Sequence, residues 1–242
     1  MNKLKIKLMQ NKQVQKSNAI ILASGKGERF GTDLPKQFIE IQGKTVIELS
    51  IEAFERNENI DNIILVANPD FRLLIEEIIS KNSYKKVSKI LDGGLSRQES
   101  SFIGVNAIQN DDDLILIHDA VRPFVADELI NDVLEALKSH DAVSCACASS
   151  DTIYRVNDKM EIVEIPARNL ILQAQTPQGF KASLIKKAHQ MAKQDQNINV
   201  TDDVSLVFNY NLASVYVVKG LSANIKITHK EDLNLSASYL QS

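Results

Sequence analysis

Short apolar segments alternate with amphipathic segments over most of this chain, and this alternation restricts the possible folds more than any other feature. The segments of strand length are Ala19–Ala23, Asn62–Ala67, Val87–Leu91, Leu114–His118 and Ala142–Ala148. Between them, apolar residues recur at helical spacing within residues 47–54, Phe71–Lys81, Ser100–Gln109 and Ala126–His140. Fully apolar strands separated by amphipathic helices are typical of a parallel sheet covered on both faces. The pattern therefore predicts an α/β fold with a doubly wound, mostly parallel sheet.

The alternation stops after Ser149. Two β-like segments, Thr152–Val156 and Glu161–Ile165, flank the turn residues 157–159, which predicts a hairpin. Beyond the hairpin we expect helices at Ser183–Gln194, Thr201–Phe208 and His229–Leu240, and strands at Ser214–Lys219 and Asn224–Thr228. Because no internal repeat or Pro/Gly linker divides the chain, we expect one domain over residues 19–242 with a protruding β-arm at about 151–175.

The first 18 residues differ from the rest in charge. They contain five lysines and no acidic residue, and they lack the long apolar stretch of a secretory signal. We expect residues 1–18 to form a basic N-terminal extension, most simply a tail. A short membrane-surface helix, or sequence upstream of a start at Met9, are the alternatives.

The composition excludes several classes of protein. Lys and Arg total 28 against 31 for Asp and Glu, a formal net charge of −3, which argues against a general nucleic-acid-binding surface. No apolar run approaches the roughly 20 residues that a membrane span needs. The two cysteines, Cys145 and Cys147, lie two residues apart on one predicted strand, so we expect buried reduced thiols rather than a disulfide. These features predict a cytoplasmic protein.

A glycine-rich loop follows the first predicted strand. It includes Ala23, Ser24, Gly25, Gly27 and Arg29, and ligands of doubly wound folds bind where such strands end. Glycines allow backbone N–H groups to approach phosphate oxygens. The spacing of Gly25, Gly27 and Gly31 misses the dinucleotide fingerprint by one residue, and the P-loop sequence is absent. With the cations Arg29 and Lys36 close by, the loop suits a triphosphate better than a single phosphate, and a plain glycine-rich turn is the alternative.

Two further motifs follow predicted strands. Asp119 and Arg122 come after the strand that ends near His118; they could bind a polyol hydroxyl or a cation, or form a loop-stabilising pair. Gly94, Arg97 and Ser100 lie between a strand and a helix, where the glycine would let the backbone read a base edge. The alternative for this second motif is an ordinary helix-capping loop.

Three polar motifs occur in the last third of the chain. Arg168 precedes a cluster that ends in Thr176, Pro177 and Gln178, and this cluster could also be an ordinary polar loop. Thr201 begins a Thr-Asp-Asp run that would suit a helix N-terminus. Lys226 stands alone in an otherwise apolar segment, where a surface or edge position is the simpler interpretation.

The motifs between about Asn18 and Leu240, and their order along the chain, resemble those of the cytidylyltransferase family that makes CDP-activated polyol phosphates. Its members act on 2-C-methyl-D-erythritol 4-phosphate or D-ribitol 5-phosphate. The resemblance rests on the glycine loop with Arg29, PKQF at 35–38, GG at 93–94, HDAVRPF at 118–124, DT at 151–152, Arg168 with TPQ at 176–178, TDD at 201–203 and NIKIT at 224–228. It implies a Rossmann-like nucleotidyltransferase fold.

The resemblance also implies roles for individual residues. The CTP-binding residues would be Ala23, Ser24, Gly25, Gly27, Gly94, Arg97, Ser100 and Thr152. The polyol phosphate would be held by Asp119, Arg122, Arg168, Thr176 and Thr201. The family is dimeric, and its arm crosses to the partner, so Arg168 would act in the partner's site.

The reaction implied is transfer of CMP from CTP to a polyol phosphate with release of pyrophosphate. We expect Arg29, Lys36 and Lys226 to be the catalytic cations, and Mg²⁺ or another divalent cation to accompany CTP because no His/Cys ligand set exists. We predict 2-C-methyl-D-erythritol 4-phosphate as the acceptor, within isoprenoid precursor synthesis. The alternative is D-ribitol 5-phosphate, giving CDP-ribitol for cell-surface polymers. A different nucleotide, or a non-catalytic scaffold, is a weaker alternative.

Overall fold

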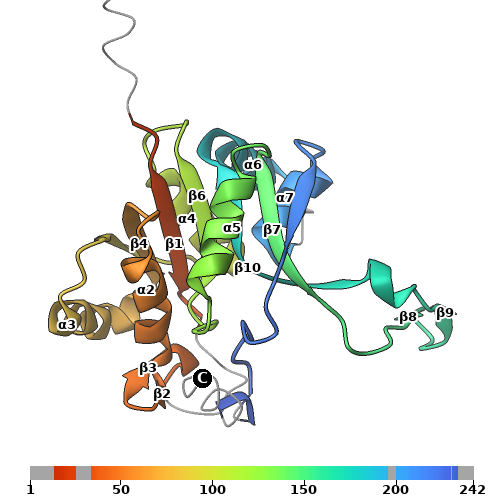
Figure 1. Cartoon of the computed structure of the whole chain (residues 1–242), viewed down its shortest axis with the longest axis horizontal. Helices are drawn as coiled ribbons and strands as arrows, with labels where there is room; N and C mark the ends of the chain where they lie inside the picture. Colours follow the sequence, from red (N-terminus) through yellow and green to blue (C-terminus); the bar gives the residue numbers. More distant parts are fainter. Residues whose placement is uncertain (1–13, 26–33, 196–199, 230, 234–242) are drawn as a thin grey trace, which may run out of the picture.

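The computed structural model describes residues 14–25, 34–195, 200–229 and 231–233. A seven-stranded sheet forms the centre of the molecule, and its strand order is β11-β7-β10-β6-β1-β4-β5 (Figure 1). Its strands are β1 (Ser17–Ala23), β4 (Asn62–Ala67), β5 (Val87–Asp92), β6 (Leu114–Asp119), β7 (Ala142–Ala148), β10 (Leu172–Lys181) and β11 (Val215–Lys219). All neighbouring pairs are parallel except the two made by β10. The prediction of a doubly wound, mostly parallel sheet is confirmed.

Helices cover both faces of the sheet. They are α2 (Val46–Arg56), α3 (Arg72–Asn82), α4 (Arg97–Asn106), α5 (Asp127–Ala136), α6 (Ala182–Gln194) and α7 (Asp203–Asn209). One apolar core packs α2, α3 and α5 against one side of the sheet, and a second packs α4, α6 and α7 against the other. Successive residues of β1 alternate between the two cores, with Ile20 in one and Ile21 in the other. This alternation explains why the central strands are apolar at every position.

Local signals set the start of two helices. Thr45 caps α2 by accepting from the backbone N–H of Glu48, whose carboxylate accepts in return from the backbone N–H of Thr45. Ser96 caps α4, so this helix begins at Arg97 rather than at Ser100 as the apolar spacing predicted. The earlier start brings Arg97 to the helix end that faces the strand ends. None of the described helices combines the length and the apolar surface that a bilayer crossing requires.

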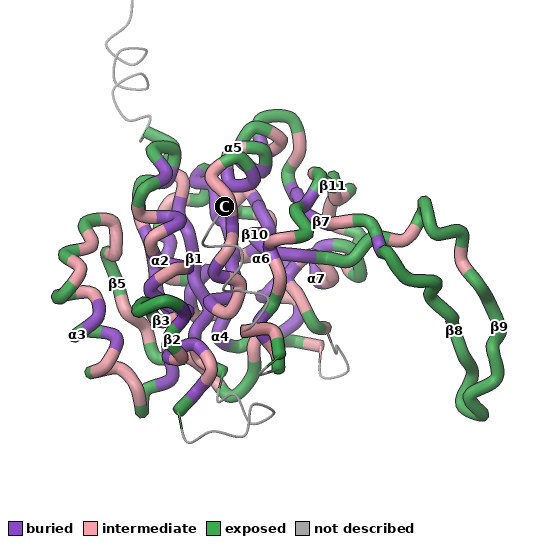
Figure 2. Tube along the Cα trace, turned by 60° about the horizontal axis from the view of Figure 1, so that its bottom comes forward, coloured by how far each residue is buried: buried purple, intermediate pink, exposed green. Residues whose placement is uncertain are grey.

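The chain between β7 and β10 leaves the body of the molecule as a long arm (Figures 1 and 2). Its tip is the antiparallel pair β8 (Arg155–Val156) and β9 (Ile162–Glu164), which confirms the predicted hairpin. A short 3-10 helix, η4 (Arg168–Leu170), follows on the returning side. Figure 2 shows that almost the whole arm is exposed.

Several sequence-based expectations require correction. Residues 173–178, which could have been a polar loop, belong to β10, which runs antiparallel between β6 and β7. Residues 172–175, expected in the arm, therefore pair within the sheet. Ser17 and Asn18, expected in the N-terminal extension, belong to β1, because Ser17 is tied to Asp61 and Asn18 is buried against β4 and β6. Residues 1–13 lie outside the described part of the chain.

Three other expectations concern the end of the chain and the thiols. Residues 224–228 form no strand, because this segment crosses the strand ends and lacks ladder bonds. The backbone N–H groups of Asn224 and Ile225 donate locally to Leu221 and Ala223, and that of Ile227 donates to Val121. Of the expected final helix, residues 231–233 are helical, and 230 and 234–240 lie outside the described residues. Cys145 is buried and free as expected, whereas Cys147 is free but only half-buried because β7 leaves the body at that point. Two short strands not predicted, β2 (Glu40–Ile41) and β3 (Lys44–Thr45), form a small hairpin before α2.

Candidate active site

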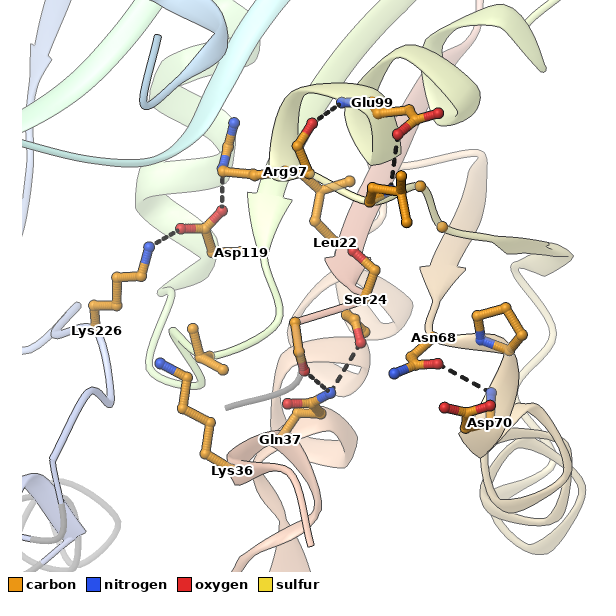
Figure 3. A pocket seen from close by; sticks show the side chains of 18 of the residues that line it. Leu22, Ser24, Lys36, Gln37, Asn68, Asp70, Arg97, Glu99, Asp119 and Lys226 are labelled. Atoms are coloured by element: carbon orange, nitrogen blue, oxygen red, sulfur yellow. Dashed lines mark hydrogen bonds and ion pairs between the residues drawn. The ribbon is translucent and has the colours of Figure 1, made fainter. Parts of the chain in front are cut away.

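A pocket of about 960 Å³ lies at the carboxyl ends of the parallel strands (Figure 3). Strand β1 is central, and the chain proceeds from it to β4 and β5 on one side and then returns to β6 on the other. The pocket is lined by residues that follow β1, β4, β5 and β6, together with Lys226 and Thr228. A crevice where the winding of a sheet reverses is the usual ligand site of doubly wound folds. The predicted residues Ala23, Ser24, Gly25, Lys36, Gly94, Arg97, Asp119 and Lys226 all line it.

The turn after β1 is anchored from below by Gln37. Its side-chain amide donates to the carbonyl oxygens of Ala23 and Gly25, both at 2.9 Å. Gln37 is almost completely buried in the short 3-10 helix η2 (Lys36–Phe38). The amide holds both carbonyls on the buried side of the turn. Gly27 and Arg29, predicted for the same loop, lie outside the described residues.

A very close approach joins the turn after β1 to the loop after β5. A Cβ built on Gly93 would lie 2.4 Å from Cβ of Ser24, so only glycine fits there. The hydroxyls of Ser24 and Ser100 are 2.7 Å apart, and Ser100 also accepts from the backbone N–H of Gly94 at 3.1 Å. Ser100 is fully buried, so it supports the two loops from beneath the pocket.

Asp119, at the end of β6, lies between two cations. Its Oδ1 accepts from Nε of Arg97 at 3.0 Å and its Oδ2 from Nζ of Lys226 at 2.7 Å (Figure 3). Burial alone would raise the pKa of Asp119, but the charges of Arg97 and Lys226 outweigh burial and hold this pKa far below its usual range. Asp119 is therefore a permanent anion that ties α4 and the segment 224–228 to the sheet.

Lys36 reaches from η2 toward the same space as Asp119 and Lys226 (Figure 3). Sequence reasoning noted its neighbour Gln37 within the PKQF motif but gave it no role. It also missed Asn68 and Asp70, which follow β4 and form the opposite wall. The rule that ligands bind beyond the carboxyl ends of strands could have found Asn68, because a strand was predicted up to Ala67.

Thr176 and Arg122 lie beneath this region and bond mainly to backbone. Thr176 is 4% exposed, and its hydroxyl accepts from the backbone N–H of Asp119 at 3.1 Å. Arg122 donates to the carbonyls of Asn224 and Ala174, at 2.8 and 3.3 Å. Arg122 thereby ties the segment that carries Lys226 to strand β10.

His118 completes the buried layer beneath Asp119. Because the carbonyl of Arg122 can only accept, Nε2 of His118 carries the proton, and Nδ1 accepts from the hydroxyl of Thr176, both at 3.0 Å. Burial lowers the pKa of His118 to about 4, so the ring is neutral at physiological pH.

Three predicted site residues lie elsewhere in this chain. Arg168 and Thr152 are exposed on the arm, where the guanidinium of Arg168 donates to the hydroxyl of Thr152 at 3.1 Å. Thr201 is exposed just before α7. None of the three belongs to the described lining of the pocket.

The described residues provide little for a metal ion on their own. Among them, no group of three or more His, Cys, Asp and Glu residues could hold one. The acidic side chains of the pocket are Asp70, Glu99 and Asp119, and each oxygen of Asp119 already accepts from a cation. This donor set fits a hard cation that enters with the oxygens of a phosphorylated ligand rather than one held in a protein cage.

Comparisons with known proteins agree with the fold. The sequence model of the 2-C-methyl-D-erythritol 4-phosphate cytidylyltransferase family (IspD) matches residues 17–242. The 2-C-methyl-D-erythritol 4-phosphate cytidylyltransferase of Clostridium tetani is 41% identical over 230 residues, which cover 95% of this chain and 92% of that protein. The bifunctional ribulose 5-phosphate reductase/CDP-ribitol pyrophosphorylase Bcs1 of Haemophilus influenzae is 39% identical over 94% of this chain and 48% of its own length.

A solved structure extends the comparison to three dimensions. The crystal structure of 4-diphosphocytidyl-2C-methyl-D-erythritol synthase from Anaerococcus prevotii superimposes with a TM-score of 0.84 at 33% identity, covering 94% of this chain and 97% of that one. The residues that the family model matches include the sheet, the strand ends and the arm rather than a single motif. This chain belongs to the 2-C-methyl-D-erythritol 4-phosphate cytidylyltransferase family.

Proposed function

We propose that this protein transfers CMP from CTP to 2-C-methyl-D-erythritol 4-phosphate and releases pyrophosphate. The observation that carries the proposal is the pocket at the strand ends, where the glycine turn after β1, the Gly93–Gly94 loop and the cations Lys36, Arg97 and Lys226 converge in a chain of this family. The relatives from Clostridium tetani and Anaerococcus prevotii carry this activity or its product in their names, which supports the same acceptor here.

The chemistry needs charge control more than proton transfer. An oxygen of the acceptor's phosphate attacks the α-phosphorus of CTP, a new P–O bond forms, and the bond to the β-phosphate oxygen breaks as pyrophosphate leaves. A phosphate monoester is largely dianionic near pH 7, because its second pKa is about 6. The attacking oxygen therefore needs no general base, which is consistent with the buried position of His118 beneath the site.

The residues have separate proposed roles. The turn at Ser24 and Gly25 would hold the CTP phosphates through backbone N–H groups, and the Gly93–Gly94 loop would contact the cytosine. Lys36 and Lys226, with Arg29, would neutralise the charge that develops on the reacting phosphates. Mg²⁺ bound to the CTP phosphates would neutralise charge and orient them. Because Arg97 and Lys226 already bond both oxygens of Asp119, this ion would be held mainly by the CTP phosphate oxygens.

The charges of the described pocket residues cancel. The three cations Lys36, Arg97 and Lys226 stand against three anions, Asp70, Glu99 and Asp119. The two substrates together bring about six negative charges, estimated from phosphate pKa values. This imbalance supports the proposal that the functional site also recruits Mg²⁺, Arg29 and a cation from a second chain.

We propose a homodimer in which the arm of one chain reaches the pocket of the other. The arm exposes several large apolar side chains to water, which is unfavourable in an isolated chain. They are Ile153, Tyr154, Val156, Met160, Ile162, Val163, Ile165 and Leu170. Arg168 and Thr152 are held together on this arm and away from their own pocket. A partner's Arg168 would supply one of the missing cations, while Thr201 would complete the acceptor site at its edge.

Location and domain organisation follow from the same proposal. The sheet domain, from Ser17 at the start of β1, would act as one catalytic unit with its arm, and the residues before Ser17 as an extension of it. Both cysteines are free, which supports a reducing compartment and therefore the cytoplasm.

D-Ribitol 5-phosphate is the second candidate acceptor. The 39% identity to Bcs1, whose name includes CDP-ribitol pyrophosphorylase, nearly equals the identity to the Clostridium tetani enzyme. The two acceptors differ in their carbon skeleton but present the same phosphate to the α-phosphorus. They would therefore use the same cations and differ only in contacts to the polyol.

The test is formation of CDP products from CTP with the two acceptors in parallel, followed by pyrophosphate release and by mass of the product. We expect a higher kcat/KM with 2-C-methyl-D-erythritol 4-phosphate. A preference for ribitol 5-phosphate would show that ribitol 5-phosphate is the acceptor. If the protein turned over neither polyol phosphate, the proposed function would be refuted. UTP, GTP and ATP in place of CTP measure nucleotide selectivity in the same assay.

A further inference from the structure

Asp203 is the most enclosed acidic residue that touches a pocket residue. Its side chain is 1% exposed, and its Oδ2 accepts from Nη1 of Arg97 at 2.8 Å. Its Oδ1 accepts from the hydroxyl of Ser101 at 2.5 Å and from Nε2 of His189 at 3.1 Å. Helices α4, α6 and α7 thus converge on one carboxylate, although Asp203 itself does not line the pocket.

The backbone of Asp203 is also fixed. Gln178, on β10, accepts from the backbone N–H groups of Asp203 and Val204, and its amide donates to Asp202 at 2.7 Å. Asp202 caps α7 by accepting from the backbone N–H of Ser205. The carboxylate of Asp203 is therefore held through both its main chain and its side chain.

Arg97 is oriented by two anions at once. Its Nε donates to Asp119 and its Nη1 to Asp203, so the planar guanidinium is fixed on two edges. Asp119 in turn holds Lys226, whose segment has no strand partner. A chain of contacts therefore leads from the interior to the pocket. His189 and Ser101 hold Asp203, Asp203 holds Arg97, and Asp119 links Arg97 to Lys226.

We propose that Asp203 is a positioning residue that sets the place of the Lys226 ammonium through Arg97 and Asp119, with His189 and Ser101 holding Asp203 in turn. The proposal rests on the function proposed above for Lys226. A buried carboxylate is costly unless each oxygen is paired, and Asp203 meets this condition through these partners. Burial would raise the pKa of Asp203, but Arg97 and the hydrogen bonds of His189 and Ser101 lower it to about 2, so it stays anionic.

This cluster is not a nucleophilic triad. Both Ser101 and His189 donate to the same oxygen of Asp203, so the imidazole is not oriented to remove the proton of Ser101. All three side chains are enclosed beneath the pocket. The histidine therefore serves the reaction through geometry alone.

The first test compares two neighbouring aspartates. Asp203→Asn keeps the size of the side chain but removes the charge that fixes Arg97; we expect kcat to fall at least about tenfold, since misplacement by about 1 Å can cost about 100-fold. The KM for CTP should change less than about threefold, because the loops after β1 and β5 keep their own contacts and Arg97 keeps its bond to Asp119. Asp202→Asn keeps the carboxylate of Asp203 and weakens only its backbone support through Gln178, so kcat should fall less than with Asp203→Asn. Asp141→Asn, which loses an exposed ion pair with Lys181 outside the pocket lining, is the control and should retain kcat.

The second test asks whether Asp203 acts through Lys226. In a Lys226→Met background, Asp203→Asn should lower the residual kcat less than about twofold, because the group that it positions is gone. If Asp203→Asn lowered kcat by the same factor in the Lys226→Met background as in the wild type, Asp203 would support only the fold, and the proposal would be overturned. An unchanged kcat for the single variant would overturn it as well.

A third pair of variants applies if Asp203→Asn does not fold. His189→Gln keeps an N–H donor toward Asp203, whereas His189→Leu has a similar size and no donor. Retained kcat in the first with reduced kcat in the second supports the proposal, and equal values overturn it. Crystal structures of the pair test the geometry without the reaction: with leucine, the Lys226 ammonium should leave Asp119. If the wild-type protein turns over neither polyol phosphate, the proposed function fails. The position of the Lys226 ammonium in the two crystal structures still tests whether Asp203 and His189 position it.

Discussion

Nζ of Lys226 lies 2.7 Å from Oδ2 of Asp119, and this contact closes one side of the pocket. Lys226 belongs to a segment without regular secondary structure, whereas Asp119 ends a buried strand. The lysine is about two-fifths exposed and the aspartate one-tenth exposed. The sheet thus supplies a rigid anion, and the anion places a cation at the edge of solvent, where a phosphate can reach it.

Replacing Lys226 should affect the reaction step more than CTP binding. Lys226→Met removes a cation that we expect to act on the developing charge, so kcat should fall about 100- to 1,000-fold while the dissociation constant of CTP changes only a few-fold. Steady-state kinetics and calorimetric CTP titration measure the two effects. Lys219→Met, at an exposed position on the edge strand β11, should change neither. A loss confined to CTP affinity would contradict the assignment.

A side chain at position 93 should separate the two nucleotide-binding loops. Gly93→Ala would place a Cβ 2.4 Å from that of Ser24, so the loops must move apart, and we expect CTP affinity to fall at least about tenfold. In a Ser24→Gly background this contact is absent, so the same substitution should cost less than about threefold. Calorimetry on the four proteins measures the coupling. Equal costs in both backgrounds would show that the close approach does not shape the site.

The buried imidazole of His118 should make stability fall in mild acid. Its pKa is about 4 in the folded protein against an ordinary 6.5, so between these values the unfolded chain binds a proton that the folded one does not. Stability should therefore decrease as pH falls from 6.5 to 4, by about 3 kcal/mol in all and about 2 kcal/mol at pH 5. Urea unfolding at pH 7.5 and 5.0 measures this loss. A His118→Gln variant should lose correspondingly less, and an equal loss would assign the effect to other groups.

Exchange of arms between two chains predicts complementation. The Arg168→Ala variant lacks the cation of the arm, and the Lys226→Met variant lacks a cation of the pocket. Each variant alone should therefore be nearly inactive. Random mixing after unfolding and refolding makes half of the dimers mixed, with one intact site in each, so about a quarter of wild-type activity should return. Mixtures of each variant with itself are the controls. No recovery, with mixed dimers demonstrated by mass, would place Arg168 in its own chain's site.

Sequence patterns predicted the parallel strands and most helices because these elements depend on local periodicity. Apolar runs such as Ala19–Ala23 and Leu114–His118 mark strands with both faces buried, and they place Ser24 and Asp119 at the same edge of the sheet. The pattern failed for β10, whose Gln175 and Gln178 bond to the segments after β11 and before α7, and whose register shifts between Gln175 and Gly179. Polar side chains and an irregular register remove the two-residue period that identifies a strand.

The sequence by itself determined the fold class, the strand-end position of the ligand site and the family, because each rests on ordered motifs and local spacing. Only the tertiary structure decided which charges meet. Arg97, Asp119, Asp203 and Lys226 come from distant parts of the chain, and Asp203 could equally have been an exposed acid at a helix N-terminus. Burial by α4 and α6 removes that carboxylate from water, so its partners become obligatory. The interaction of distant charges in a low-dielectric interior cannot be derived from spacing along the chain.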